Sequence, residues 1–307
     1  MDSIKSLADQ YDWKRVFVIQ NFLWMLGLHV LALVVAPFFF RWDAFLLAWT
    51  FTFVSAYSMG IFHHMMLTHD SFRSKKWIMY LGSLLGTLTW RGPFSGPLKY
   101  VAMHAVHHEY SDRDRDPHSP IHGLFFSFMG WFWRMSPPFL NEAQYLVFVP
   151  ERIRHDKVLR FMDRHVHGLQ AFWGFLCFAL GCIIESQSGL RAQLLAGLSF
   201  VLYGVFVKSM LVIWMADTVD LINHTIGYRN FETRDHSTNS FIMAAVHLGG
   251  AISWHNNHHA QPDFFSVKAR WWEIDVHYRF LQFLSFMGLV WDVKVLDMRK
   301  SEVAQQA

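Results

Sequence analysis

Cysteine is scarce in this sequence, and its shortage excludes one class of chemistry. The 307 residues include two cysteines, Cys177 and Cys182. They lie five residues apart inside one apolar run, where the spacing does not suit a thiol redox pair and the surroundings do not suit a thiolate. We therefore interpret both as small, buried hydrophobic residues.

Charge is also in short supply. Charged residues make up 17% of the chain, and the formal net charge is +3. The Lys and Arg residues are scattered and form no basic helix face, which argues against nucleic acid as a partner. A mildly basic chain is instead attracted to an anionic membrane surface. Hydrophobic residues make up 53%, above the roughly 45–50% of soluble domains, so we expect helices that cross a bilayer.

Four apolar runs are long enough to cross a hydrocarbon core, which takes about 20 helical residues. They cover residues 16–40, 44–67, 168–184 and 194–217. Short links join the first run to the second and the third to the fourth, so the sequence predicts an all-α integral membrane protein with two transmembrane hairpins. Segment 70–166 has thirteen Lys and Arg residues, whereas the two links have only Arg41 and Arg191. The positive-inside rule therefore places both termini and segments 70–166 and 218–307 in the cytosol.

Histidine is abundant, with nineteen residues, and nine of them form a pattern. The nine are His64, His69, His104, His107, His108, His224, His255, His258 and His259. Two triplets have HxxHH spacing, which points three imidazoles the same way because residues three and four apart share a helix face. His64 and His69 are five apart, so we place one in the last turn of its span and the other just past it. His224 stands alone after the fourth run.

Nine imidazoles on one side of the membrane predict a metal centre. A structural zinc takes four ligands and would leave histidines over. Nine nitrogens suit two five- or six-coordinate metals with a position open for oxygen, and iron is the natural choice among the metals that imidazole binds. We therefore expect one membrane domain, residues 1–307, whose cytosolic helical part carries a histidine-rich di-metal site.

Further motifs surround these histidines in a fixed order. They are Gly60 before the first pair and Asp70-Ser71-Phe72 after it, Gly92-Pro93, Tyr110-Ser111-Asp112, Asp116 to Pro120, Gly123 to Trp131, Trp254 to His259, Trp271 to Asp275 and Leu289 to Lys294. This order resembles the membrane-bound fatty-acid desaturase family, specifically its stearoyl-type, delta-9-like branch in bacterial form. The resemblance implies a di-iron centre held by the nine histidines, an acyl tunnel between the helices, O2 as co-substrate and an outside electron donor.

Three departures from the family pattern, at four positions, stand out. Asp220 stands where the family usually has an Asn that helps to hold a metal-bound water; a carboxylate could ligate iron directly or bind that water more strongly, and we assign Asp220 a catalytic role. Met65 and Asp70 replace two usual arginines, which puts recognition of the substrate headgroup in question. Phe128 replaces a frequent His that is not among the nine ligands.

The resemblance predicts an enzyme that introduces a cis double bond into a saturated acyl chain carried by coenzyme A or by a lipid. Asp112 and Asp116 are expected either to bind the imidazole N–H groups or to cap a loop. The segment WRGPFSGP is expected to line the substrate mouth or to form a plain turn. A di-iron hydroxylase of acyl chains, sterols or alkanes is one alternative function, and a non-catalytic membrane metal-binding protein is another.

The expected partners are a fatty-acyl substrate, membrane lipid and a separate electron donor. No HPGG-type motif of a fused haem domain is present, so a ferredoxin or cytochrome must deliver the electrons, and Arg152 and Arg154 are candidates for docking an acidic donor. We expect the inner membrane of a bacterium, with the endoplasmic reticulum as the alternative. The position of the double bond, the chain length and the acyl carrier stay open.

Overall fold

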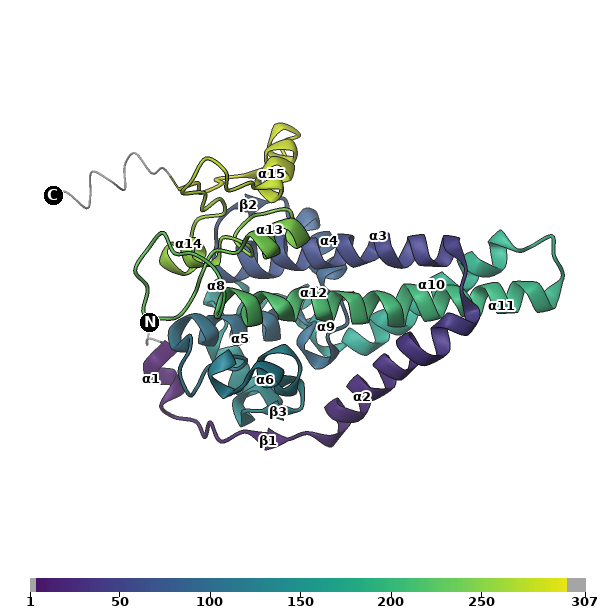
Figure 1. Cartoon of the computed structure of the whole chain (residues 1–307), viewed down its shortest axis with the longest axis horizontal. Coiled ribbons are helices and arrows are strands. Elements are labelled where there is room, and N and C mark those ends of the chain that lie inside the picture. Colours follow the sequence, from purple (N-terminus) through teal and green to yellow (C-terminus); the bar gives the residue numbers. More distant parts are fainter. Residues whose placement is uncertain (1–3, 297–307) are drawn as a thin grey trace.

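The computed structural model describes residues 4–296 and is built mainly of helices. Figure 1 shows a narrow stalk of long helices that widens at one end into a group of short helices and loops. The first helix, α1, and the last described strand, β4, both belong to the wide end (Figure 1).

Four helices are long and apolar enough to cross a membrane, by length and composition: Ile19–Phe39, Trp42–Thr68, Val166–Ile184 and Leu190–Asn223. The first consists of α2 (Ile19–Val30), a π-helical η1 (Leu31–Val35) and a 3₁₀ turn η2 (Ala36–Phe39). The second consists of α3 (Trp42–Ser58) and a π-helical η3 (Met59–Thr68). The third is α10 (Val166–Ile184), and the fourth consists of α11 (Leu190–Val201), a π-helical η9 (Leu202–Val207) and α12 (Lys208–Asn223).

The four helices overlap the four predicted runs, but seven of the eight boundaries differ, and only the end at Ile184 coincides. Two of these differences bear on the wide end. The first helix begins at Ile19 because Val16–Phe17 form strand β1, which pairs with β3 (Arg134–Met135) of the wide end. The fourth helix continues to Asn223. At 1.5 Å per residue its 34 residues span about 50 Å, which is longer than the roughly 30 Å hydrocarbon core, so its last turns reach into the wide end.

The long helices pack in two ways. Helices α10 and α11 are joined by a short link and pack against each other, with Gly181 facing Ala196 so closely that an added Cβ would lie 2.6 Å from the Ala196 carbonyl oxygen. Helix α2 diverges from α3 (Figure 1) and continues into η1, which packs on η9 of the fourth helix. Small residues allow this close approach of helix backbones.

Short elements make up the wide end. The helices are α1 (Ile4–Ala8), α4 (Lys76–Thr87), α5 (Pro97–Tyr110), α6 (Leu124–Phe128), α7 (Glu142–Tyr145), α8 (Glu151–Arg154), α9 (Lys157–Arg164), α13 (Phe241–His247), α14 (His255–Ala260) and α15 (Val276–Phe286). The 3₁₀ turns are Gly92–Phe94, Pro120–His122, Gly130–Phe132, Pro137–Leu140 and Leu146–Phe148. A second antiparallel pair joins β2 (Arg73–Ser74) to β4 (Val290–Trp291).

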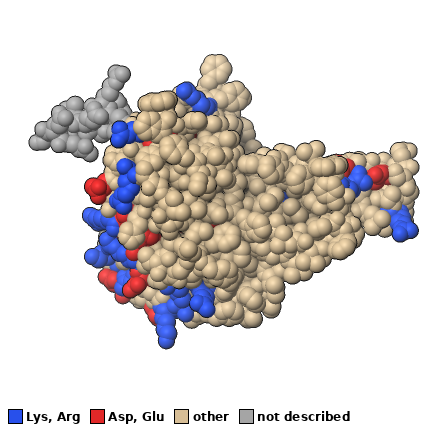
Figure 2. Space-filling view, in the orientation of Figure 1, with Lys and Arg blue, Asp and Glu red and all other residues tan. Residues whose placement is uncertain are grey.

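Charge is distributed as a membrane protein requires. In Figure 2 the charged side chains gather on the wide end and at the narrow tip, and the stalk between them shows almost none. Ion pairs of Arg41 with Asp43 at 2.7 Å and with Glu185 at 2.9 Å tie the two helix links together. An uncharged band between two charged ends matches the polarity profile of a bilayer.

Candidate metal centre

The first of two histidine clusters combines ligands from three separate parts of the chain. We call it the five-histidine cluster: His64, His69, His104, His108 and His258. Their ring nitrogens all lie within 4.8 Å of one another. His64 Nε2 lies 2.9 Å from His258 Nε2, and His108 Nε2 lies 3.0 Å from His104 Nε2. A set of imidazoles that aim the same nitrogen at one point has the geometry of a metal shell.

The π-helix η3 explains how His64 and His69 meet. Its hydrogen bonds join residues five apart, and the His69 N–H donates to the His64 carbonyl oxygen at 3.2 Å. The wider turn places both rings on one side, with centroids 4.9 Å apart. His64 lies inside η3 and His69 directly follows it, as the sequence predicted. Turns of this kind are rare and often occur at functional sites.

The second set, which we call the four-histidine cluster, lies beside the first. It contains His107, His224, His255 and His259, with ring nitrogens again within 4.8 Å. His107 comes from α5, His224 follows α12, and the other two lie on α14. The His108 and His259 rings are 4.5 Å apart, so the HxxHH helices α5 and α14 each contribute to both clusters. All nine histidines singled out in the sequence therefore come together.

Carboxylates hold three rings of the four-histidine cluster from behind. Nδ1 of His107 bonds to Asp116 at 3.0 Å, and Nδ1 of His224 bonds to Asp112 at 2.7 Å. This confirms the expectation that Asp112 and Asp116 bind the imidazoles. Nδ1 of His259 bonds in the same way to Asp235 at 2.7 Å. A carboxylate behind a ligand ring fixes its tautomer and aims Nε2 at the metal.

Asp235 was not found from the sequence. It belongs to the polar segment RDHSTNS, which has no spacing that relates it to a histidine. Its carboxylate also accepts hydrogen bonds from Ser237 and Thr233. These bonds fix the loop, and the loop brings Asp235 to the ring.

The two clusters differ in the charges around them. Among the described residues, no carboxylate lies within 4 Å of a ring nitrogen of the five-histidine cluster. Burial and the neighbouring imidazoles hold the pKa of His69 and of His258 well below the usual 6.5. Burial alone would also lower the pKa of His107, but the charge and hydrogen bond of Asp116 outweigh it and raise the pKa to about 9.

These residues fit a pair of metal ions. Nε2 of His107 and of His259 are buried and have no hydrogen-bond partner, although their Nδ1 atoms are bonded to carboxylates. An orphaned nitrogen aimed at a cluster of others is explained by a missing metal bond. Five nitrogens in one set and four in the other satisfy two separate metals of moderate coordination number.

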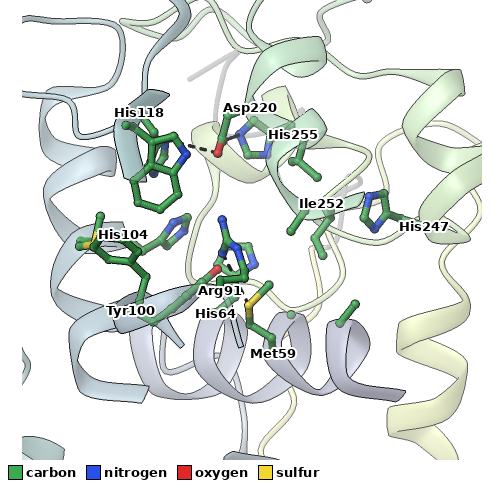
Figure 3. A pocket seen from close by; sticks show the side chains of 17 residues that line it. Met59, His64, Arg91, Tyr100, His104, His118, Asp220, His247, Ile252 and His255 are labelled. Carbon is green, nitrogen blue, oxygen red and sulfur yellow. Dashed lines mark hydrogen bonds and ion pairs between the residues drawn. The ribbon is translucent and has the colours of Figure 1, made fainter. Parts of the chain in front are cut away.

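Asp220 lies at the edge of the four-histidine cluster. Its Oδ1 is 3.8 Å from Nε2 of His255, and its Oδ2 is 3.3 Å from Nδ1 of His118. The side chain is 18% exposed, and it faces an internal cavity (Figure 3). The carboxylate therefore stands within reach of a metal, or of a water bound to a metal, at the side from which the cavity approaches.

The cavity reaches both clusters from one side. His64 and His104 of the five-histidine cluster line it, and so does His255 of the four-histidine cluster (Figure 3). The remaining wall is largely apolar and aromatic, with side chains from α3, η3, α5 and α12, from the turns Gly92–Phe94 and Gly130–Phe132, and from the segment after α13. These are Ala56, Met59, Phe94, Met103, Trp131, Ala216, Val219 and Ile252. A largely apolar space beside two candidate metal sites suits a hydrocarbon ligand.

The structure also shows the surroundings of four other residues that the sequence analysis singled out. Met65 is buried at 3% exposure, and Asp70 forms ion pairs with Arg73 and with Arg152. Arg152 also donates to the carbonyl oxygen of Leu67 at 2.5 Å, and Arg154 donates to that of Val149 at 2.8 Å. Both arginines named as donor-docking candidates thus bond to the protein's own backbone.

Comparisons with known proteins agree with this geometry. A sn-1 stearoyl-lipid 9-desaturase of Anabaena variabilis is 34% identical over 91% of this chain and 95% of its own. A sn-2 palmitoyl-lipid 9-desaturase of Nostoc sp. (strain 36) is 32% identical over 85% of each chain. An acyl-CoA 5-desaturase of Anemone leveillei is 30% identical over 95% of this chain and 85% of its own. The family model described as fatty acid desaturase matches residues 40–291, so the chain belongs to the fatty acid desaturase family.

Proposed function

We propose that this fatty acid desaturase introduces a cis double bond into a saturated acyl chain bound in the cavity, using two iron ions. One observation carries the proposal: two buried sets of convergent imidazoles open onto the same apolar cavity. The acyl chain would lose two hydrogen atoms from neighbouring carbons. O2 would take up these two together with two electrons and two protons, and would leave as two waters.

The nine histidines would hold the irons. The five-histidine cluster would bind one and the four-histidine cluster the other, with Asp220 as a further ligand or as the holder of a bound water. When bound, the irons supply the oxygen activation needed to oxidise an unactivated methylene. The chain's own part is to fix the ligands: Asp112, Asp116 and Asp235 keep the Nδ1 protons in place, so each Nε2 lone pair points inward.

The cavity wall would position the chain and keep out water. Phe94 and Arg91 of the segment WRGPFSGP line the cavity, which supports a substrate-contact role for this segment over a plain turn. Exclusion of water strengthens electrostatic interactions at the site and protects reactive species from side reactions. The wall residues would select which two carbons face the clusters.

We further propose that the four long helices cross the inner membrane of a bacterium as two hairpins. Both termini and segments 70–166 and 218–307 would then be cytosolic; residues 297–307 of the last segment lie outside the described part. The supporting observation is the charge distribution, because basic residues are concentrated on the wide end and the tip has few (Figure 2).

The carrier and the electron donor are proposed only by class. The relatives are named for acyl-lipid and acyl-CoA substrates and for bond positions 9 and 5, so either carrier fits this chain. A separate ferredoxin or cytochrome would reduce the irons. Since Arg152 and Arg154 bond to backbone carbonyls, other exposed basic residues of the wide end would provide most of the docking charge.

A hydroxylase with the same metal centre is the second candidate. The observation that favours it is Asp220, because a carboxylate beside the four-histidine cluster changes the charge of the site. A non-catalytic membrane metal-binding protein is the third candidate, but it gives no reason for an apolar cavity that reaches both clusters.

The test is the fatty-acid profile of a host that lacks its own desaturase, measured by gas chromatography with mass spectrometry. We expect the wild type to produce a monounsaturated acid and His258→Ala to produce none. His155→Ala serves as the matched control, because His155 is 69% exposed and pairs only with Glu151, so this variant should retain activity. A hydroxylated acid would favour the second candidate, and an unchanged profile with folded, iron-loaded protein and a working donor would refute the acyl-lipid reading.

A further inference from the structure

Helix α15 has an apolar stripe that is open to the surroundings of the protein. Val276, Phe280 and Phe283 lie on it, together with Met287 directly after the helix, and their exposed fractions are between 41% and 57%. These positions recur every three or four residues, so they share one side of the helix. Single exposed apolar residues are normal, but a continuous stripe of them marks a contact with a partner or with a membrane.

The remaining surface of α15 has a buried side and a polar side. The buried side consists of His277, Leu281 and Leu284. The polar side consists of the exposed residues Arg279, Gln282 and Ser285. A helix that is packed on its own protein and leaves both an apolar and a polar side exposed has the pattern of a helix at the surface of a bilayer.

The direction of α15 agrees with this pattern. In Figure 1 it runs across the long axis of the molecule, whereas α3 and α12 run along that axis. The ring of His277, near the start of α15, lies 4.8 Å from the ring of Tyr57 near the end of α3. Since the stalk would cross the bilayer along its own axis, α15 would lie parallel to the membrane plane, where the stalk widens.

Neighbouring segments add further exposed apolar residues. The Val276 N–H donates to the Leu248 carbonyl oxygen at 3.2 Å, which joins α15 to the end of α13. Phe241 and Ile242 of α13 are 60% and 56% exposed, and Trp271, which precedes α15, is 83% exposed. Tryptophan is enriched at the headgroup level of membranes. We call the α15 stripe, these two residues of α13 and Trp271 the α13–α15 surface.

Basic residues border this surface. Lys268, Arg270 and Arg279 are exposed, and the ion pairs of the described residues include none of them. The acidic residues of the same segment, Glu273 and Asp275, are at least partly buried and accept hydrogen bonds from backbone N–H groups. Two copies of this chain that met here would bring like charges together, whereas anionic lipid headgroups would be attracted.

We propose that the α13–α15 surface lies in the cytosolic leaflet of the membrane and binds anionic lipid headgroups through Lys268, Arg270 and Arg279. The inference goes beyond the proposed function, and it rests on the proposed membrane crossing rather than on desaturation. It has a consequence for the cavity, because His247 at the end of α13 lines the cavity. Lipid held by this surface would lie one short helix away from the proposed acyl site.

The test measures what surrounds α15 in the full-length protein, reconstituted with its bound metal in lipid nanodiscs. A fluorophore is attached through Phe283→Cys on the apolar stripe, or through the matched control Ser285→Cys, which lies about 200° further round the helix. Both variants are made in a Cys177→Ala/Cys182→Ala background. The quenchers are phosphatidylglycerol and phosphatidylcholine with nitroxide-labelled headgroups, and iodide in the water.

We expect the lipid nitroxides to quench the fluorophore at position 283, and iodide to quench it at position 285. Phosphatidylglycerol should quench at position 283 at a concentration about fivefold or more below that of phosphatidylcholine, since each basic residue near an anionic surface contributes about that factor. The triple variant Lys268→Gln/Arg270→Gln/Arg279→Gln should lose this preference and keep the protection from iodide. Phe280→Cys, on the same stripe, replaces Phe283→Cys if the latter does not fold.

Three results would overturn the inference. Equal quenching by iodide at positions 283 and 285 would place α15 in water. Protection of position 283 from both iodide and the lipid nitroxides would show that protein covers the stripe. An unchanged preference for phosphatidylglycerol in the triple variant would assign lipid recognition to other residues.

The proposed membrane crossing and the proposed reaction are judged separately. Phe172 of α10 is 61% exposed, so a fluorophore on Phe172→Cys should be quenched by lipid with a nitroxide on its acyl chain. Quenching there, without lipid quenching at position 283, would retain the crossing and refute the α13–α15 inference alone. The fatty-acid profile tests desaturation independently, because the quenching is measured without substrate.

Discussion

The five-histidine cluster and the four-histidine cluster are neighbours, yet only one of them is surrounded by acid. Asp112, Asp116 and Asp235 bond to rings of the four-histidine cluster, and Asp220 stands 3.8 Å from another. None of the described carboxylates approaches a ring nitrogen of the five-histidine cluster within 4 Å. Two sites with nearly the same ligands thus sit in different fields, which stabilise a metal cation to different degrees.

The difference suggests a division of labour between the two proposed irons. Anionic partners behind the ligands raise their basicity and favour the more highly charged form of a metal. The acid-backed site is therefore expected to hold its metal more tightly and to be harder to reduce. The five-histidine site has one more nitrogen but lacks these carboxylate partners.

Removal of one carboxylate should have the largest effect on this asymmetry. Asp112→Asn replaces the acceptor of the His224 Nδ1 proton with an amide of the same shape, and it also disturbs the bond from Ser119. We expect iron affinity of the four-histidine cluster to fall about 10–100-fold, with the other site unchanged. Ferrous titration followed by Mössbauer spectroscopy would distinguish the sites. The control Asp114→Asn, an exposed residue of the same loop, should leave both intact; equal losses at both sites would contradict the comparison.

The second prediction concerns pH. The pKa of His107 is raised to about 9, so this ring is protonated in the metal-free protein at pH 7 and must release the proton to bind. Affinity of the four-histidine cluster should fall up to about tenfold for each pH unit below 9. The five-histidine rings His69 and His258, whose pKa values lie well below 6.5, should show no such dependence near neutral pH.

Calorimetry of metal binding in buffers of different ionisation heat would count the protons released at each site. The raised pKa of His107 also makes the stability of the metal-free fold depend on pH. Its contribution is fully present below about pH 6.5, and it is lost as pH rises through about 9. Equal proton release at the two sites would show that Asp116 does not distinguish them.

A smaller effect is expected at Asp220. Asp220→Asn removes one negative charge from the cavity side of the four-histidine cluster, and we expect its iron affinity to fall about three- to tenfold with a change in the Mössbauer parameters of that iron alone. Asp220→Glu keeps the charge and serves as the comparison. If Asp220→Asn alters neither iron, the carboxylate interacts with His118 rather than with the metal site.

The smallest effect is expected for a change beside the five-histidine cluster, which has no carboxylate partners. Arg152 binds the carbonyl oxygens at the end of η3, so Arg152→Gln should destabilise the fold by about 1 kcal/mol and lower the melting temperature by about 2–4 °C. Arg154→Gln is the control, because Arg154 bonds instead to Val147 and Val149 and should leave the five-histidine iron spectrum unchanged. An identical spectral change in both variants would argue against a specific support of η3.

Much of the site could be predicted because its signals are periodic. The two HxxHH triplets fall on helices α5 and α14, and spacing alone indicated that each would present three rings on one face. The four long helices were predictable for a similar reason, since continuous apolar runs of sufficient length have few alternatives. Asp112 and Asp116 could be predicted because they follow the first HxxHH triplet within one loop.

The remaining features depend on tertiary contacts. A π-helical turn at His64 leaves no mark in composition, and the first span starts late because Val16–Phe17 pair with a distant strand. Asp235 reaches His259 only through its loop, and Arg91 meets Asp217 across 126 residues of sequence. Such pairings come from the packing of the whole domain, which local patterns do not encode.

The ends of two long helices have a mechanical consequence. Trp42–Thr68 brings His64 to the five-histidine cluster, and Leu190–Asn223 ends one residue before His224 of the other. Helices α3 and α12 pack along each other, so any sliding or tilting of one against the other would change the spacing between the two sites. Bilayers of different thickness impose different tilts on such helices. The thickness of the surrounding bilayer would thereby set the spacing between the five-histidine and four-histidine clusters.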